Sequence, residues 1–431
     1  MNECVITSDK LAPNKLAPNK LAPNKLAPNK LAPNKLAPNK LATDKLAPNK
    51  LAPNKLATDK LATDKLATDK PVLERDTLGR VFTPPILVQE LYALLSPLLR
   101  PGMRVYEPGV GDMRFHAAYP FPCTYSGCEI SPVGDLPLTI YKGDFFDQPL
   151  SMYDLILGNP PFRIETSGPQ TSPTPTKCPQ VTIWPKIVKR CMEHLAEGGY
   201  LAMLLPCIWL KPDKEGIHEL FMKYRILSIR CYSCTESNKL FGYKCQTPVS
   251  LVVLQKVPSV GSFLIYDNGY IPFTVIHPPC IPTQNAALLQ ASHRLIRTPL
   301  TCIKMSTVPK GNVIANPSKK FPLLTTFKEG MIHGLELDKP GPYHGIPKVL
   351  LLHKSQPVPF LDLHGSYGVG GRDVYVLPVD SYEMMSDPLV QKILKSFTIR
   401  MNYYEKQTFH YLPCVEEFYE WKKSISILYD P

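Results

Sequence analysis

Residues 159–162, Asn-Pro-Pro-Phe, are the segment of this sequence best suited to chemistry. Prolines at 160 and 161 stiffen the chain and remove two amide donors. The carboxamide oxygen of Asn159 and the carbonyl of Pro160 can then present two acceptors side by side, which suits an exocyclic NH2 group. Accepting both N–H bonds takes the nitrogen lone pair out of conjugation and makes the amine a nucleophile, and Phe162 can stack on the ring that carries it. Taken alone, the tetrapeptide could equally be a rigid turn that closes a strand.

Three acidic segments precede this tetrapeptide at regular intervals. Residues 107–112 read Glu-Pro-Gly-Val-Gly-Asp, and their glycines permit the close approach of a ligand. Glu129 ends the next apolar run, where an acid can accept from the two hydroxyls of a ribose. Asp144 and Phe145 end the third, where a carboxylate can accept from an adenine amine and a ring can stack on it. This ordered series favours a binding site over coincidence.

The apolar pattern predicts the elements that must position these residues. Short β-like runs alternate with helical stretches, which indicates an α/β fold with a mostly parallel sheet and helices on both faces. Ligands of such sheets bind at the carboxyl ends of the strands. We predict helices at 86–98, 184–196 and 213–224, and strands at 103–107, 124–130, 138–144, 153–158, 200–206, 226–233 and 248–256.

The N-terminal part is a tandem repeat. Residues 11–70 are twelve perfect pentads, eight reading LAPNK and four reading LATDK. A five-residue period matches neither helix nor strand, and one Leu and one Ala per pentad bury too little surface to order the chain. Residues 10–70 carry a net charge of +9 out of +12 for the whole chain, and residues 71–431 carry only +5. We therefore expect a disordered tail at 1–70, and net charge alone is weak evidence for a polyanionic partner.

Composition excludes several classes of protein. The longest nearly unbroken apolar run, 200–210, has 11 residues and contains a proline, whereas a membrane-spanning helix needs about 20. The N-terminus lacks the basic and apolar regions of a signal peptide, so the 12 cysteines are expected to be reduced thiols of an intracellular, soluble protein. Cys231 and Cys234 fit a core strand and have no fourth partner, so no metal site is expected.

With these motifs in view, the sequence resembles the gamma-class, Taq-type DNA adenine-N6 methyltransferases, a family of amino-methyltransferases with an NPPY or NPPF motif. The resemblance spans about residues 79–257. It is carried by the segments GRVFTPP (79–85), RVYEPGVGD (104–112), CEISP (128–132), YDLILGNPPF (153–162), EGGYLAMLLPCIWL (197–210) and KLFGYKCQTPVSLVVLQK (239–256). Phe162 stands where many members have Tyr, and residues 163–180 form a longer connection than is usual.

The resemblance implies a Rossmann-like, S-adenosylmethionine-dependent methyltransferase domain at 71–259, followed by a mixed α+β target-recognition domain at 260–431. It also implies a role for individual residues. The cofactor would be bound by Thr83, Glu107, Gly109, Gly111, Glu129, Ile130, Asp144 and Phe145. The target amine would be held by Asn159 and Pro160, and the flipped base would be stacked by Phe162 and Phe241.

The expected function is therefore transfer of a methyl group to the N6 amine of adenine in DNA, by a monomer that is not membrane-bound. The same chemistry on RNA bases or on a protein glutamine amide is one alternative. A second alternative, from another class, is an inactive methyltransferase-like protein that binds nucleic acid. The intact Asn159, Pro160 and Phe162 argue against the second alternative.

Overall fold

The computed structural model describes residues 81–118, 123–132, 134–165, 180–242, 245–275, 278–305, 321–328, 331–354, 357–371, 374–400 and 404–429. The predicted tail at 1–70 lies outside these residues. By its contacts the chain divides into two units, Met1–Pro71 and Val72–Pro431. The second unit contains all the described residues.

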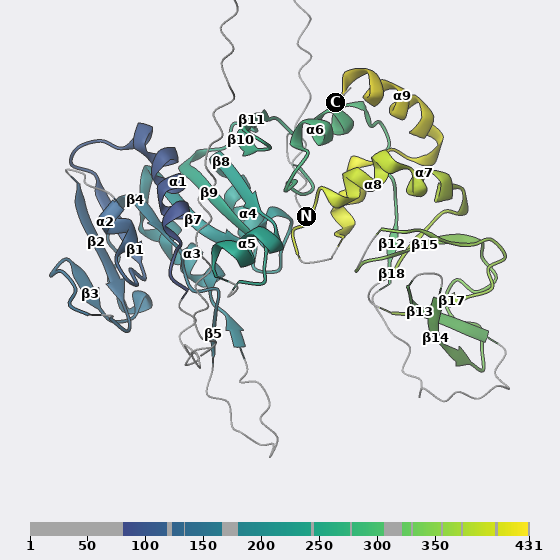
Figure 1. Cartoon of the computed structure of the whole chain (residues 1–431), viewed down its shortest axis with the longest axis horizontal. Coiled ribbons are helices and arrows are strands. Elements are labelled where there is room, and N and C mark those ends of the chain that lie inside the picture. Colours follow the sequence, from purple (N-terminus) through teal and green to yellow (C-terminus); the bar gives the residue numbers. More distant parts are fainter. Residues whose placement is uncertain are drawn as a thin grey trace, which may run out of the picture. The chain divides into compact units, whose positions relative to one another are not determined.

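A nine-stranded sheet forms the first part of this unit, with the strand order β11-β10-β8-β9-β7-β4-β1-β2-β3 (Figure 1). Its strands are β1 (Arg104–Pro108), β2 (Thr124–Glu129), β3 (Ile140–Lys142), β4 (Tyr153–Gly158), β7 (Leu195–Pro206), β8 (Tyr224–Tyr232), β9 (Val249–Pro258), β10 (Phe263–Tyr266) and β11 (Tyr270–Phe273). The pairs of β1, β2, β3, β4 and β7 are all parallel, whereas β9 runs antiparallel to both of its neighbours. The predicted α/β fold with a mostly parallel sheet is confirmed.

Apolar side chains alternate between the two faces of the sheet. In β4, Leu155 and Leu157 pack into one core cluster and Ile156 into the other, and β7 alternates in the same way. The helix α1 (Pro85–Leu95) covers the first face, and α3 (Trp184–His194) and α4 (Ile217–Met222) cover the second. Strands buried on both faces are near-continuously hydrophobic, as the central strands of this chain are.

Three differences from the predicted elements have local causes. β7 begins at Leu195, five residues earlier than predicted, because α3 already ends at His194. The helix α5 (Cys234–Leu240), which was not predicted, begins with a capping box between Ser233 and Glu236, so Cys234 lies in a helix and not in a strand. The hairpin of β10 and β11 extends the sheet beyond residue 260, because β10 pairs in parallel with β8.

The later residues form smaller sheets and several helices. The sheet order is β12-β18-β15-β16 in one and β14-β13-β17 in the other, and β5 (Arg163–Glu165) pairs separately with β6 (Gln180–Thr182). The strands are β12 (Ile303–Lys304), β13 (Phe321–Lys328), β14 (Met331–Leu337), β15 (Lys348–Leu352), β16 (Phe360–Asp362), β17 (Gly368–Val369) and β18 (Val374–Leu377). The helices are α6 (Ala286–Leu295), α7 (Tyr382–Ser386), α8 (Pro388–Lys395) and α9 (Phe418–Leu428).

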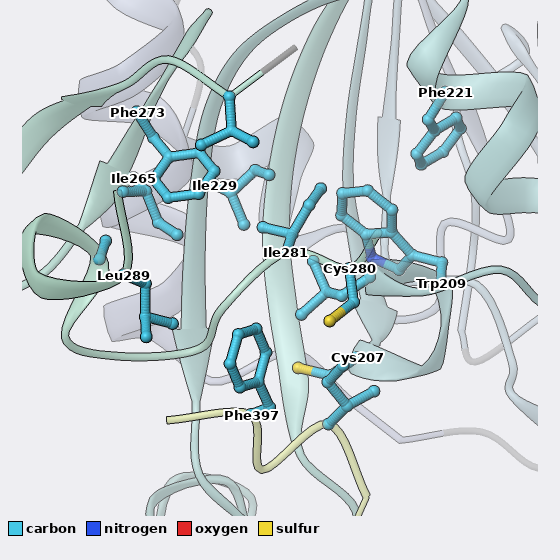
Figure 2. Packing of buried hydrophobic residues seen from close by; sticks show 14 of the residues in the cluster. Cys207, Trp209, Phe221, Ile229, Ile265, Phe273, Cys280, Ile281, Leu289 and Phe397 are labelled. Carbon is cyan, nitrogen blue, oxygen red and sulfur yellow. The ribbon is translucent and has the colours of Figure 1, made fainter. Parts of the chain in front are cut away.

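One cluster of buried side chains continues from the large sheet into these later residues. Figure 2 shows part of it, where Trp209 and Cys207 of the sheet region lie near Ile281 and Phe397. The amide of Ile281 donates to the carbonyl of Leu210 at 2.7 Å. Shared packing of this kind fixes the segment that ends at Arg400 against the carboxyl end of β7.

In the described part of the chain, no helix combines the length and the apolar character needed to cross a membrane.

Candidate active site

A cavity of about 1520 Å³ opens at the carboxyl ends of the strands. Its wall contains every residue to which the sequence assigns a role, although they come from segments spread over more than 150 residues of sequence. The lining residues lie in the segments 81–83, 107–112, 114–115, 128–130, 143–146, 159–164, 181–187, 211–215, 245–247 and 399–400, together with 206, 208 and 241. The predicted position of the site, at the carboxyl edge of the sheet, is that of the cavity.

The glycine loop after β1 is attached to the end of β2. Gly109 and Gly111 have φ angles of +85° and +54°, which favour glycine. The amide of Gly109 donates to the carbonyl of Cys128 at 2.9 Å, and the amide of Gly111 donates to Oε2 of Glu129, also at 2.9 Å. The loop can therefore keep one conformation beside the carboxylate of Glu129.

Glu129 is buried, and both of its oxygens already accept one hydrogen bond. Oε1 accepts from the amide of Ser131 at 3.0 Å, while Oε2 accepts from Gly111. A carboxylate oxygen can accept more than one bond, so this side chain is oriented and still able to receive two hydroxyls. The exposed side chain of Ile130 lies next to it on the cavity wall.

Glu107 and Thr83 are buried on the same side of the cavity. Glu107 accepts a hydrogen bond from the hydroxyl of Tyr125. Burial raises the pKa of Glu107 well above its ordinary value, and the Tyr125 hydroxyl offsets only part of that effect. The carbonyl of Thr83 accepts from Nη1 of Arg114 at 2.8 Å, and Arg114 also pairs with Asp112 at 2.5 Å.

The two aromatic residues after Asp144 differ in how far they are buried. Asp144 caps a short 3-10 helix, Phe145–Asp147, by accepting from the amide of Phe146 at 2.9 Å. The ring of Phe145 is only 6% exposed and packs against Tyr106 and His194, with centroid distances of 5.9 and 5.6 Å. Phe146 is 38% exposed and lines the same cavity. Both rings line the cavity, and the sequence prediction named only Phe145.

Asn159 is oriented by a long-range contact. Its Nδ2 donates to the carbonyl of Val81 at 3.1 Å, so Oδ1 is the atom that is left to accept. Phe162 is half-buried between the two core clusters, and its carbonyl accepts from the amide of Ile183 at 3.2 Å. Phe241, just after α5, is buried and lies on the wall of the same cavity. Asn159, Pro160, Phe162 and Phe241 are thus brought together with the acidic loops.

The structure also places cationic residues on the wall of the cavity. Four of them are Arg163, Lys186, Lys211 and Arg400. These four residues are far apart in the sequence, and only the fold brings them to one cavity. Among the described residues, there is no group of three or more His, Cys, Asp or Glu that could hold a metal ion.

Comparison with known proteins gives two curated relatives, and no family model matches the chain. One is the type II methyltransferase M.TthHB8I of Thermus thermophilus, 30% identical over 167 residues, which are 34% of this chain and 39% of the relative. The other is the modification methylase CviBIII of Paramecium bursaria Chlorella virus NC1A, 24% identical over 206 residues, 44% of this chain and 52% of the relative. The chain thus spans about half the length, or less, of the relatives it matches.

Among solved structures, the methyltransferase subunit of a type I restriction-modification system from Streptococcus thermophilus aligns with a TM-score of 0.32 and 18% identity. The alignment covers 45% of this chain and 50% of that one. This structural similarity is low, so no argument is based on it. By name, both of these sequence relatives are methyltransferases.

Proposed function

We propose that this chain transfers the methyl group of S-adenosylmethionine to the N6 amine of an adenine in DNA. The observation that carries the proposal is that Asn159, Pro160 and Phe162 share one cavity with the carboxylates of Glu129 and Asp144. Both sequence relatives are methyltransferases by name, which supports methyl transfer as the reaction. Because N6 of adenine is paired inside a duplex, the base must be extruded into the cavity to react.

The residues of the first three loops fit S-adenosylmethionine. Glu129 can accept from the ribose hydroxyls, because Gly111 and Ser131 hold its carboxylate in place. Asp144 uses Oδ1 to cap the 3-10 helix, which leaves Oδ2 to accept from the adenine amine. Ile130 and Phe146 are the exposed apolar side chains beside that position. When bound there, S-adenosylmethionine supplies an electrophilic methyl group on a positively charged sulfur.

The Asn159 loop activates the acceptor amine by hydrogen bonding alone. Oδ1 of Asn159 and the carbonyl oxygen of Pro160 accept the two N–H bonds, and the lone pair of the nitrogen then turns toward the cofactor side of the cavity. The bond to Val81 keeps the amide of Asn159 from rotating its nitrogen into that position. No general base is needed before transfer, because the amine loses its extra proton only afterwards. Orientation and fixed dipoles are the main contributions of the protein.

Phe162 and Phe241 are the proposed walls of the pocket for the base. Both lie on the cavity, and Phe162 is supported from behind by two core clusters. Stacking on an aromatic ring stabilises a bound base by about 1–3 kcal/mol, which offsets part of the cost of unstacking it from the duplex. Such a pair of rings also favours a nucleobase over a glutamine amide as the acceptor.

The proposal is tested by incubating the full-length protein with S-adenosylmethionine labelled in its methyl group and with separate pools of DNA, RNA and protein. The DNA pool should be long, unmethylated duplex, so that it contains most short recognition sequences. We expect label in DNA, recovered as N6-methyladenine after digestion and mass spectrometry. The matched control is Asn159→Ala, which should bind the cofactor and transfer nothing.

The other outcomes separate the alternatives. Label found only in RNA or only in protein would indicate that the same methyl transfer uses an RNA base or a protein amide as the acceptor. Tight binding of DNA without any transfer would favour an inactive nucleic-acid-binding protein.

A further inference from the structure

Charge is unevenly distributed around the wall of the cavity. The carboxyl ends of β1, β2 and β3 and the loops after them contribute four acids, Glu107, Asp112, Glu129 and Asp144, and one base, Arg114. The described part of the remaining wall contributes two acids and five bases, the latter being Arg163, Lys186, Lys211, Lys214 and Arg400. Since β4 lies between β7 and β1, the Asn159 loop stands at the boundary between the two halves. The acidic half suits a cationic cofactor, and the basic half suits an anion.

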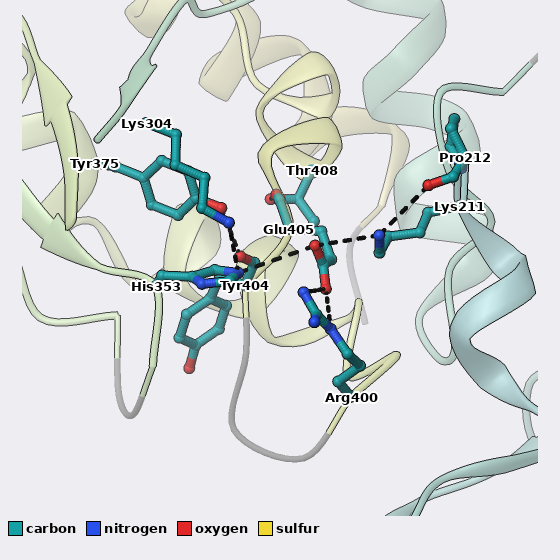
Figure 3. Close-up of polar contacts among 9 residues, drawn as sticks. All are labelled: Lys211, Pro212, Lys304, His353, Tyr375, Arg400, Tyr404, Glu405 and Thr408. Atoms are coloured by element: carbon teal, nitrogen blue, oxygen red, sulfur yellow. Dashed lines mark hydrogen bonds and ion pairs between the residues drawn. The ribbon is translucent and has the colours of Figure 1, made fainter. Parts of the chain in front are cut away.

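Two of these bases are joined by one buried carboxylate, that of Glu405. Oε1 of Glu405 accepts from Nε and Nη2 of Arg400 at 2.7 and 2.6 Å, and Oε2 lies 3.6 Å from Nζ of Lys211 (Figure 3). Nε2 of His353 lies 3.9 Å from Oε2, and Nζ of Lys304 lies 3.3 Å from that same nitrogen. The cluster therefore holds more positive than negative charge.

The backbone on both sides fixes this cluster at the cavity. Lys211 follows the 3-10 helix Cys207–Leu210 at the end of β7. Phe397 and Ile399, just before Arg400, are buried in the core, and the hydroxyl of Thr283 donates to the carbonyl of Ser396 at 2.9 Å. Arg400 is therefore presented by a packed segment.

The two bases differ in how much of each reaches solvent. The side chain of Lys211 is 13% exposed and that of Arg400 is 39% exposed, and both line the cavity. Because Glu405 already fixes the plane of the guanidinium, a second anion that meets its exposed edge loses little side-chain entropy. A guanidinium of fixed orientation suits the paired oxygens of a phosphate diester.

We propose that Arg400 binds a backbone phosphate of the strand that carries the target base, that Glu405 is its positioning residue, and that Lys211 adds the second positive charge. This inference rests on the proposed function. A nucleotide whose base enters the cavity remains joined to its two flanking phosphates, which must then lie near the rim beside the Asn159 loop. Of the two cavity-lining cations that Glu405 holds, Arg400 is the more exposed.

The test measures binding of a fluorescent DNA duplex by the full-length protein at several salt concentrations. Each phosphate contact adds about 1 to the slope of log affinity against log salt. Arg400→Gln, which keeps a donor for Glu405, should weaken binding at low salt and reduce the slope by about 1. Arg400→Lys should keep the slope but weaken binding several-fold, because an ammonium lacks the paired donors.

Arg104→Gln is the matched control. Arg104 pairs with Asp154 at 3.3 Å, its side chain is half-exposed, and it stands at the amino end of β1, opposite the cavity edge. The Arg104→Gln substitution removes the same charge from the chain and should leave the slope of log affinity against log salt unchanged. Cofactor affinity, measured in the same samples, should be equal in all variants and reports that they are folded.

Two results would overturn the inference, and they differ. If wild-type protein binds and methylates DNA while the Arg400 variants keep its affinity and slope, Arg400 makes no phosphate contact and the proposed function stands. If wild-type protein neither binds nor methylates DNA, the proposed acceptor fails and the phosphate contact fails with it. Should Arg400→Gln not fold, Arg400→Lys decides, because unchanged affinity in that variant also contradicts the bidentate contact.

Discussion

The amide of Asn159 has one of its two groups committed, since Nδ2 bonds to the carbonyl of Val81. That contact joins the opening segment of the described chain to the loop after β4. It leaves Oδ1 beside the carbonyl of Pro160 as the acceptor pair on which the proposed chemistry depends. At the residue scale, the proposed reaction depends on Oδ1 of Asn159, and not Nδ2, facing the substrate.

Asn159→Ala should reduce the turnover number by at least about 100-fold, the size of effect seen when one preorganised hydrogen-bonding group of an active site is removed. The dissociation constant for S-adenosylmethionine should stay within about twofold, because Asn159 does not belong to the acidic loops. Radiometric methyl transfer and isothermal titration calorimetry measure the two quantities. Phe162→Tyr is the control, since it keeps the stacking ring and should keep activity. Retained turnover in Asn159→Ala would contradict the mechanism.

Glu107 should couple cofactor binding to a proton. Burial raises its pKa, so the carboxyl group of the free protein holds its proton at higher pH than an ordinary Glu does. A cation bound nearby favours the ionised form and lowers that pKa again. Binding should therefore release a proton, and cofactor affinity should rise as pH rises through the pKa of the free protein.

The number of protons released by Glu107 is measured by calorimetry in two buffers of different ionisation enthalpy. Wild-type protein should show a buffer-dependent binding enthalpy, and Glu107→Gln should show a smaller dependence. Equal buffer dependence in the two proteins would assign the proton to another group.

The strands β1 and β2 approach each other closely at the site. Glu107 of β1 is in register with Gly127 of β2, and a Cβ atom on Gly127 would lie 2.6 Å from the carbonyl oxygen of Glu107. It would also lie 2.6 Å from Cγ1 of Val110, in the glycine loop. A side chain at this position must therefore move the backbone that carries the glycine loop.

Gly127→Ala should lower the free energy of unfolding by about 1–3 kcal/mol, as overpacking of a core does, and should weaken cofactor binding. The adjacent Ser126→Ala is the control, because its hydroxyl makes only a long bond of 3.3 Å to the carbonyl of Val105. Urea unfolding and a cofactor titration measure the two effects. Similar losses in both variants would mean that the contact with the glycine loop does not matter.

Across the whole described unit, Glu405 links the end of β7 to the segment that carries Arg400. Burial by itself would raise the pKa of Glu405, but the hydrogen bond of His353 and the charges of Lys211 and Arg400 together lower it to about 2. A carboxyl group whose pKa is lower in the folded state than in the unfolded state stabilises the fold. This stabilisation is fully present at pH values above the unfolded pKa, which is about 4.3 for Glu. That stabilisation is lost as pH falls toward 2.

Glu405→Gln should therefore be less stable than wild type at pH 6, and the difference should shrink by about 3 kcal/mol as pH falls to 2. Urea unfolding at pH 6, 4, 3 and 2 follows this change. Glu197→Gln is the control, because Glu197 pairs with Lys256 from an exposed position and should show no such trend. A stability difference that is independent of pH would contradict the role assigned to Glu405.

The local sequence predicted most of the elements that hold the site. β1, β2 and β4 begin and end within one residue of the predicted strands, because each is a short apolar run bounded by turn residues. Their order along the chain was enough to place the acidic loops and the Asn159 loop at one edge, since parallel strands have their carboxyl ends together.

Tertiary structure decided how far two neighbouring aromatic side chains are buried at the site. Phe145 and Phe146 both line the cavity, but Phe145 packs against Tyr106 and His194 and is buried, whereas Phe146 is 38% exposed. The hairpin of β10 and β11 likewise extends the sheet because β10 pairs with β8. These choices depend on partners that are distant in the chain.

Sequence by itself determined the chemistry available to this protein, because the residue types and their order on successive strands specify the acceptors and the acids. It could not determine what surrounds them. Lys211 and Arg400 lie far apart in the chain, and a buried carboxylate, Glu405, brings them together only in the folded state. Local patterns specify elements, whereas long-range packing and charge pairing specify the rim of the cavity where a substrate would have to bind.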